Sequence, residues 1–79
     1  MINPLKKFKE ENNFTYQELS AVCEVCSSTI YKNLEGSNSQ ITPAILNTMV
    51  EFGYDRQQLE EDYQEFRKAK RNRLMQKRA

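Results

Sequence analysis

The chain has 79 residues, of which 38% are hydrophobic and 29% charged, and its formal net charge is +1. A chain of this length forms a single small domain. Because it contains no apolar run of about 18 residues and begins without the apolar stretch of a signal peptide, we expect a cytoplasmic protein with no membrane partner.

The charges are distributed unevenly along the chain. Residues 1–66 contain five basic residues and all eleven acidic ones, which gives a formal charge of −6. Residues 67–79 contain seven basic residues and no acidic one, which gives +7. We therefore predict a folded domain over 1–66 and a basic helix extension or tail over 67–79, and this asymmetry indicates a polyanionic or acidic partner.

The residue types that most catalytic and metal sites require are scarce. The sequence has no histidine and two glycines, so it contains no glycine-rich phosphate loop. Cys23 and Cys26 form a lone C-x-x-C pair, which cannot complete a tetrahedral zinc site within one chain. We expect no enzyme, no cofactor and no metal, with Cys23 in the core and Cys26 in a turn.

Local signals predict the first two helices. Asn3-Pro4 combines a cap with a proline at the first helical position, and the helix should end near Asn12-Asn13. Thr15 and Glu18 form a capping box, which predicts a second, short helix over about 16–23.

Three further helices follow by the same signals. A third helix is expected over about 27–34 and is closed by Gly36, whereas Thr42-Pro43 begins a fourth and Asp55 caps a fifth. Apolar residues at helical spacing should face the core of this all-α, compact bundle of about five helices. These residues are Leu5, Phe8, Leu19, Val22, Cys23, Ile30, Leu34, Ile45, Leu46, Met49, Val50, Phe52, Leu59, Tyr63 and Phe66.

Two short helices joined by a break of three to four residues, over roughly 15–36, form a helix-turn-helix pattern. In its order and spacing the stretch 5–54 resembles the phage repressor class of helix-turn-helix DNA-binding domains, the Cro and lambda-repressor type. The residues that carry the resemblance are Leu5 to Thr15, Gln17-Glu18-Leu19-Ser20-Ala21, Val25 to Ile30, Gly36, Ile41-Thr42-Pro43 and Phe52-Gly53.

The resemblance implies a sequence-specific transcription regulator of phage or mobile-element type, whose third helix reads the major groove of double-stranded DNA. The positions that it implies for DNA contact are Tyr16, Gln17, Ser27, Ser28, Thr29, Tyr31, Lys32 and Asn38. Two positions depart from the family pattern: Glu24 stands where glycine is common, which implies a strained or altered turn, and Cys26 replaces the usual serine cap.

Two further questions stay open at the level of sequence. Glu35 and the single cation Lys32 on the third helix also fit a protein-interaction module that binds another regulator, a polymerase or a packaging enzyme. The helix over 55–78 either supplies phosphate contacts or pairs with a second copy as a homodimer, acidic half against basic half. The tail residues assigned to phosphate or partner contacts are Arg67, Lys68, Lys70, Arg71 and Arg73.

Overall fold

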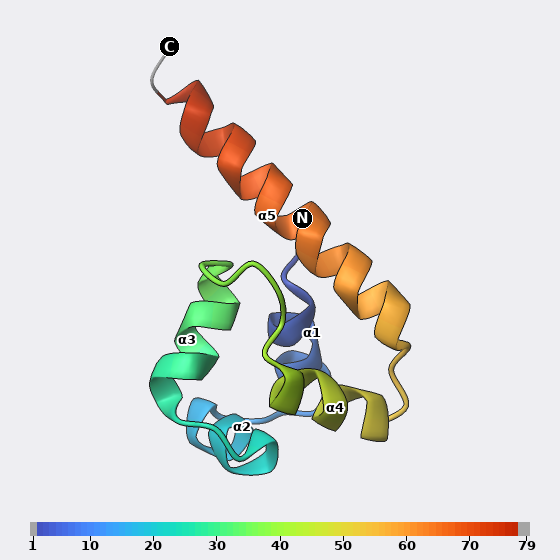
Figure 1. The fold of residues 1–79 in the computed structure, drawn as a ribbon. Helices are drawn as coiled ribbons and strands as arrows, with labels where there is room; N and C mark the ends of the chain where they lie inside the picture. Colours follow the sequence, from blue (N-terminus) through green and yellow to red (C-terminus); the bar gives the residue numbers. More distant parts are fainter. Residues whose placement is uncertain (1, 78–79) are drawn as a thin grey trace.

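Five helices account for most of the chain. The computed structural model describes residues 2–77, and over this range it contains five α-helices and no strand (Figure 1). The helices are α1 (Pro4–Glu11), α2 (Tyr16–Cys23), α3 (Ser27–Glu35), α4 (Pro43–Glu51) and α5 (Arg56–Gln76). The predicted all-α fold is confirmed. Met1, Arg78 and Ala79 lie outside the described residues, and so does the end of the predicted basic tail.

Side-chain caps fix where three of these helices begin. The side chain of Asn3 accepts a hydrogen bond from the Leu5 amide at 2.8 Å. Thr15 and Glu18 form both bonds of the predicted capping box, at 3.1 and 2.9 Å. Asp55 caps α5 in the same way. Each cap satisfies amides that have no partner within the helix, so the helix starts follow directly from local sequence.

The end of α3 requires its glycine for two reasons. Gly36 has φ of 78°, a left-handed conformation that residues with a side chain rarely adopt. A Cβ atom at this position would also lie only 3.0 Å from the Phe66 ring. The end of α3 therefore packs directly against α5.

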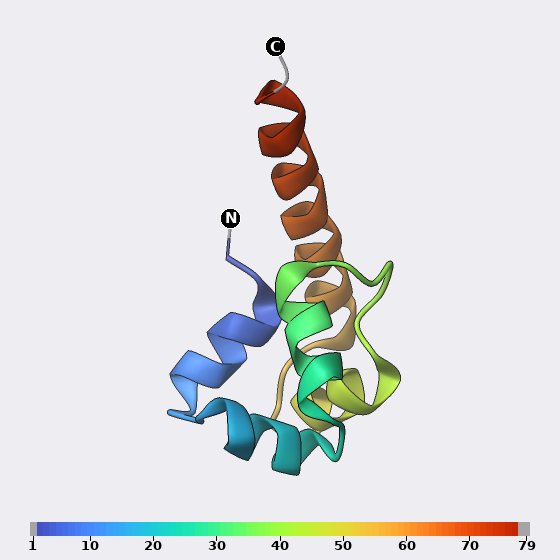
Figure 2. The same cartoon turned by 90° about the vertical axis from the view of Figure 1, so that its left-hand side faces the viewer.

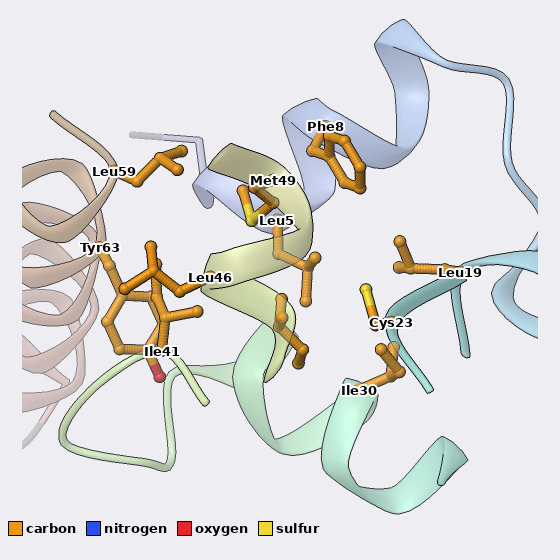
Figure 3. Close-up of a cluster of buried hydrophobic side chains, with 11 residues drawn as sticks. Leu5, Phe8, Leu19, Cys23, Ile30, Ile41, Leu46, Met49, Leu59 and Tyr63 are labelled. Carbon is orange, nitrogen blue, oxygen red and sulfur yellow. The ribbon is translucent and has the colours of Figure 1, made fainter. Parts of the chain in front are cut away.

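The core lies between all five helices, and Figure 3 shows its side chains converging from them. Phe8 and Ile45 are fully buried, and Tyr63 brings α5 into the same cluster at 1% exposure. The buried hydrophobic residues are Leu5, Phe8, Leu19, Cys23, Ile30, Ile41, Ile45, Leu46, Met49, Leu59 and Tyr63. Ten of these eleven were expected from helical spacing, and Ile41, in the loop before α4, was not.

The structure corrects one of the expected core residues most clearly. Phe52 is 46% exposed, because it lies beyond the last turn of α4. Its ring makes T-shaped contacts with Phe8 and Phe14, at 5.1 and 5.9 Å between centroids. The other expected core residues that are only partly buried are Val22, Leu34, Val50 and Phe66.

The basic segment continues α5 as a helix through Gln76. This helix is about 31 Å long at 1.5 Å per residue, and its C-terminal end extends beyond the other four helices (Figures 1 and 2). The molecule consequently measures 41 × 24 × 20 Å. The predicted alternative of a helix extension, rather than an irregular tail, is what the structure has over residues 67–76.

A buried polar cluster joins α3 to the rest of the bundle. Asn33 is 0% exposed, and its side chain donates to the Thr29 carbonyl at 3.1 Å and to the Thr42 hydroxyl at 2.8 Å. Its side-chain oxygen accepts from the Thr42 amide at 3.0 Å. Asn3 in turn donates to the Asn33 carbonyl at 2.9 Å. Asn33 therefore connects α3 to the start of α4 through its side chain and to the N-terminal segment through its carbonyl.

Candidate nucleic-acid interface

The turn between α2 and α3 consists of Glu24, Val25 and Cys26. Glu24 adopts a left-handed conformation (φ 55°, ψ 42°), which costs a residue other than glycine about 1 kcal/mol. Val25 packs partly buried against the core, and its amide donates to the Ser20 carbonyl at 3.1 Å. The Ser20 hydroxyl donates back to the Val25 carbonyl. These bonds fix how α3 leaves α2. Because Glu24 takes the left-handed conformation that favours glycine, the turn is strained.

One side of α3 is buried and the opposite side is exposed. Ile30 and Asn33 hold the helix against the body. Ser28, Tyr31 and Lys32 are exposed, and their spacing of three and four residues places them on one stripe of the helix. Glu35 is also exposed and lies on the same stripe, one turn further on. We call these four residues, Ser28, Tyr31, Lys32 and Glu35, the α3 stripe.

The position of α3 leaves this stripe accessible. The helix forms the left edge of the molecule in Figure 1 and faces the viewer in Figure 2, with α2 at its base. No other helix lies in front of it in that view. An element presented in this way can enter a groove without any rearrangement of the body.

Aromatic rings extend the α3 stripe onto α2. The rings of Tyr16 and Tyr31 lie 5.4 Å apart between centroids, and the two residues are 47% and 49% exposed. The ammonium group of Lys9 lies 4.5 Å from the centroid of the Tyr16 ring, within the range of a cation–π interaction. The structure thus adds Lys9, on α1, to the face predicted from sequence. The position of Lys9 on this face could not be predicted from helical spacing, because the spacing of residues within α1 does not reveal how α1 packs beside α2.

The other predicted contact residues occupy different surroundings. Gln17 and Ser27 are exposed near the starts of α2 and α3. Thr29 is half-buried, and its hydroxyl lies 3.2 Å from the Cys26 sulfur. Asn38 lies beyond the C-terminal end of α3, where its carbonyl accepts a hydrogen bond from the Tyr63 hydroxyl at 2.8 Å. The backbone of Asn38 is therefore engaged with α5, away from the start of α3.

Cys26 occupies the N-cap position of α3 and is exposed. Its sulfur lies 3.1 Å from the Ser28 hydroxyl and 3.2 Å from that of Thr29. Hydrogen bonding to Ser28, and next to Thr29, lowers the pKa of the Cys26 thiol from 9.0 to about 6. The other thiol behaves in the opposite way, because burial raises the pKa of Cys23. At neutral pH the start of α3 therefore carries a thiolate.

This difference predicts selective alkylation. In the native protein, iodoacetamide should modify Cys26 at pH 7.5 while Cys23 reacts only after unfolding in urea, because the thiolate is the reactive form. The rate at Cys26 should rise with pH around a midpoint of about 6, since the thiolate fraction increases through the pKa. Ser28→Ala should move the midpoint upward by removing the largest stabilising hydrogen bond. Cys26→Ser is the control that isolates Cys23, and a midpoint near 9 in the unsubstituted protein would contradict the assignment.

The basic residues of α5 fall into two groups. Arg67 donates to the Gly36 carbonyl at 3.1 Å and to the Ser39 carbonyl at 3.3 Å. Lys70 donates to the Glu35 carbonyl. These two cations satisfy carbonyls at the C-terminal end of α3, where positive charge also interacts favourably with the helix dipole. Lys68, Arg71 and Arg73 are instead exposed, so they are the members of the predicted tail set that are accessible to a partner.

Comparisons with protein-family models, with curated proteins and with solved structures gave no match. Within residues 2–77, no helix is both long enough and apolar enough to cross a membrane.

Proposed function

We propose that the chain is a sequence-specific DNA-binding transcription regulator of the phage repressor type, in which α3 reads the major groove. The α3 stripe is the observation that carries this proposal: Ser28, Tyr31 and Lys32 are exposed on a helix that the buried Ile30 and Asn33 anchor to the core. Rigid support matters because base contacts require side chains to be placed accurately.

The dimensions and chemistry of α3 suit this role. An α-helix with its side chains is about 10–12 Å across, which matches a major groove about 12 Å wide. Serine hydroxyls hydrogen bond to base edges, and lysine binds the acceptors of guanine or a phosphate. The Tyr16 ring lies 5.4 Å from that of Tyr31 and is tilted by 39° to it. It stands beside the α3 stripe, where the sugar-phosphate backbone would pass.

The α3 stripe carries little positive charge, and Lys9 on α1 adds one cation beside it. Lys32 lies on the stripe and Lys9 lies against Tyr16, whereas Glu35 and the Cys26 thiolate repel phosphate. Because phosphate neutralisation provides much of the affinity of DNA-binding proteins, we expect weak binding by a single copy and a marked dependence on salt.

A protein-interaction module is the second candidate function, and Glu35 together with the exposed Tyr16–Tyr31 pair favours it. Exposed tyrosines are common in protein interfaces. The two functions differ in one simple measurement. DNA binding predicts duplex affinity that falls steeply with salt, whereas the module predicts no measurable duplex binding even at low salt.

The test begins with selection of bound duplexes from a random pool by the purified chain. Fluorescence anisotropy then compares the selected duplex with a scrambled one. The double variant Ser28→Ala/Lys32→Ala should lose at least about 10-fold in affinity for the selected duplex, since each base contact contributes about 1–3 kcal/mol. Its circular dichroism spectrum should be unchanged, because both side chains are exposed.

Lys7→Ala is the matched control, because it removes the same charge from an exposed position on α1. It should leave the preference for the selected duplex intact. Failure to enrich any sequence, or full retention of the preference by the double variant, would overturn the assignment of α3 as the recognition helix.

A further inference from the structure

The flank of α5 that faces the loop after α3 contains a basic groove. This groove, of about 590 Å³, runs between Gly36-Ser37 and the C-terminal half of α5. Arg67, Lys68 and Arg71 line it, together with Leu74 and Met75, which are 51% and 56% exposed. It thus offers positive charge and apolar surface together.

The same flank of α5 is acidic toward its other end. A second depression, between Ile41, Leu46 and the N-terminal half of α5, is lined by Glu60 and Gln64. Gln64 lines both depressions. Glu60, Gln64, Arg67 and Arg71 follow one another at spacings of four, three and four residues, so they form one continuous stripe.

These charges find few partners within the chain. Among residues 2–77, the one salt bridge joins Lys68 to Glu65 at 3.9 Å, with side chains that are 74% and 55% exposed. Such an exposed pair contributes little to stability. Arg67 is engaged with the Gly36 and Ser39 carbonyls, whereas Glu60 and Arg71, at the two ends of the stripe, are exposed. Both ends of the stripe are therefore available to an external partner.

The stripe is complementary to itself. A two-fold axis near Gln64 and Lys68 would place a second α5 antiparallel to the first, so that Glu60 and Glu61 of each copy lie beside Arg71 of the other. A parallel arrangement would instead oppose like charges. Two-fold symmetry uses each pairing twice, which is the usual geometry of a homodimer interface.

We propose that the Glu60–Met75 flank of α5 docks antiparallel on the same flank of a second copy of this chain. The complementary charges at the two ends of the flank indicate a second copy of the chain as the partner. The exposed Leu74 and Met75 favour a protein partner, because a phosphodiester backbone would leave these apolar side chains uncovered. The proposal concerns α5 and does not depend on DNA binding by α3.

The test uses two charge-reversed variants and sedimentation equilibrium of the full chain without DNA. One variant, Glu60→Lys/Glu61→Lys, makes the flank basic throughout, and the other, Lys68→Glu/Arg71→Glu, makes its exposed positions acidic. Arg67 and Lys70 are left unchanged, because they cap α3. Circular dichroism confirms that each variant is folded.

The unsubstituted chain should dimerise at low salt, and its dissociation constant should rise as salt is added. Each variant alone should dimerise at least about 10-fold more weakly, because like charges then face each other. An equimolar mixture should restore a heterodimer, since acid again meets base at both ends.

Three results would overturn the proposal. The first is an unsubstituted chain that stays monomeric at low salt at a concentration on the order of 100 μM, within the range of weak complexes. The second is equal dimerisation of the variants and the unsubstituted chain. The third is a mixture that stays monomeric. Because no DNA is present, none of these results bears on the proposed recognition by α3.

Discussion

Phe8→Ala is expected to destabilise the domain by about 3–5 kcal/mol, the usual cost of truncating a fully buried phenylalanine. Phe8 is 0% exposed, and its ring makes edge contacts with three others: Phe14 at 5.8 Å, Phe52 at 5.1 Å and Tyr54 at 5.3 Å between centroids. A small domain has a stability of only about 5–15 kcal/mol, so this loss leaves little margin. Urea unfolding followed by circular dichroism measures the change.

Phe52→Ala is the matched control for this prediction. Phe52 belongs to the same aromatic cluster but is 46% exposed, so less apolar surface is returned to water on truncation. We expect less than half of the Phe8 effect, on the scale of about 25 cal/mol per Å² of buried apolar area. Equal losses for the two substitutions would show that Phe8 is not the centre of the cluster.

Asn33→Leu is expected to cost about 2–3 kcal/mol although leucine is apolar and of similar size. The substitution removes the acceptor of the Thr42 amide and the donor to the Thr42 hydroxyl, which are bonded at 3.0 and 2.8 Å. A buried polar group left without a partner costs about 1–3 kcal/mol. The same urea titration reports the change, and amide hydrogen exchange at Thr42 should accelerate.

Asn47→Leu controls for the loss of an asparagine as such. Asn47 is exposed on α4 and accepts from Arg56 at 2.7 Å, so water can replace that bond. We expect a change within about 0.5 kcal/mol, as for most surface substitutions. If Asn33→Leu were equally mild, the polar cluster would not be what joins α3 to α4.

Local signals predicted the helix starts well because the information lies within a few residues. Thr15 and Glu18 form their capping box across a single turn, and no tertiary contact is needed to specify it. The resemblance implied a strained or altered turn at Glu24, and the structure has the strained one, with Glu24 in the left-handed conformation. The apolar spacing identified most of the core for the same reason.

Features that depend on the packing of distant segments could not be predicted in this way. Asn33 lies on a helix with polar neighbours, so the sequence does not distinguish a buried amide from a solvated one. The burial of Ile41 and the exposure of Phe52 both depend on how α4 meets α1 and α5. Arg67 and Lys70 bind carbonyls that lie 31 and 35 residues earlier in the chain, so local sequence does not reveal the contacts that hold this part of α5 against α3.

The candidate interface likewise combines features that local sequence predicts with features that depend on the packing of distant segments. The exposure of Ser28 and Lys32 follows from the position of Ile30, which fixes the orientation of α3. The contact between the tilted rings of Tyr16 and Tyr31, with Lys9 over the first ring, combines three helices and has no sequence signature.

The bonds from Arg67 and Lys70 to the end of α3 have a consequence for local opening. Fraying of the last turn of α3 would have to break the bonds to the Gly36 and Glu35 carbonyls, and loosening of α5 near Lys70 would break the same bonds. Two segments that share their contacts in this way open as one cooperative unit, with a common free energy of opening. The exposed end of α5 beyond Lys70 has no such tie to α3 and can fray separately.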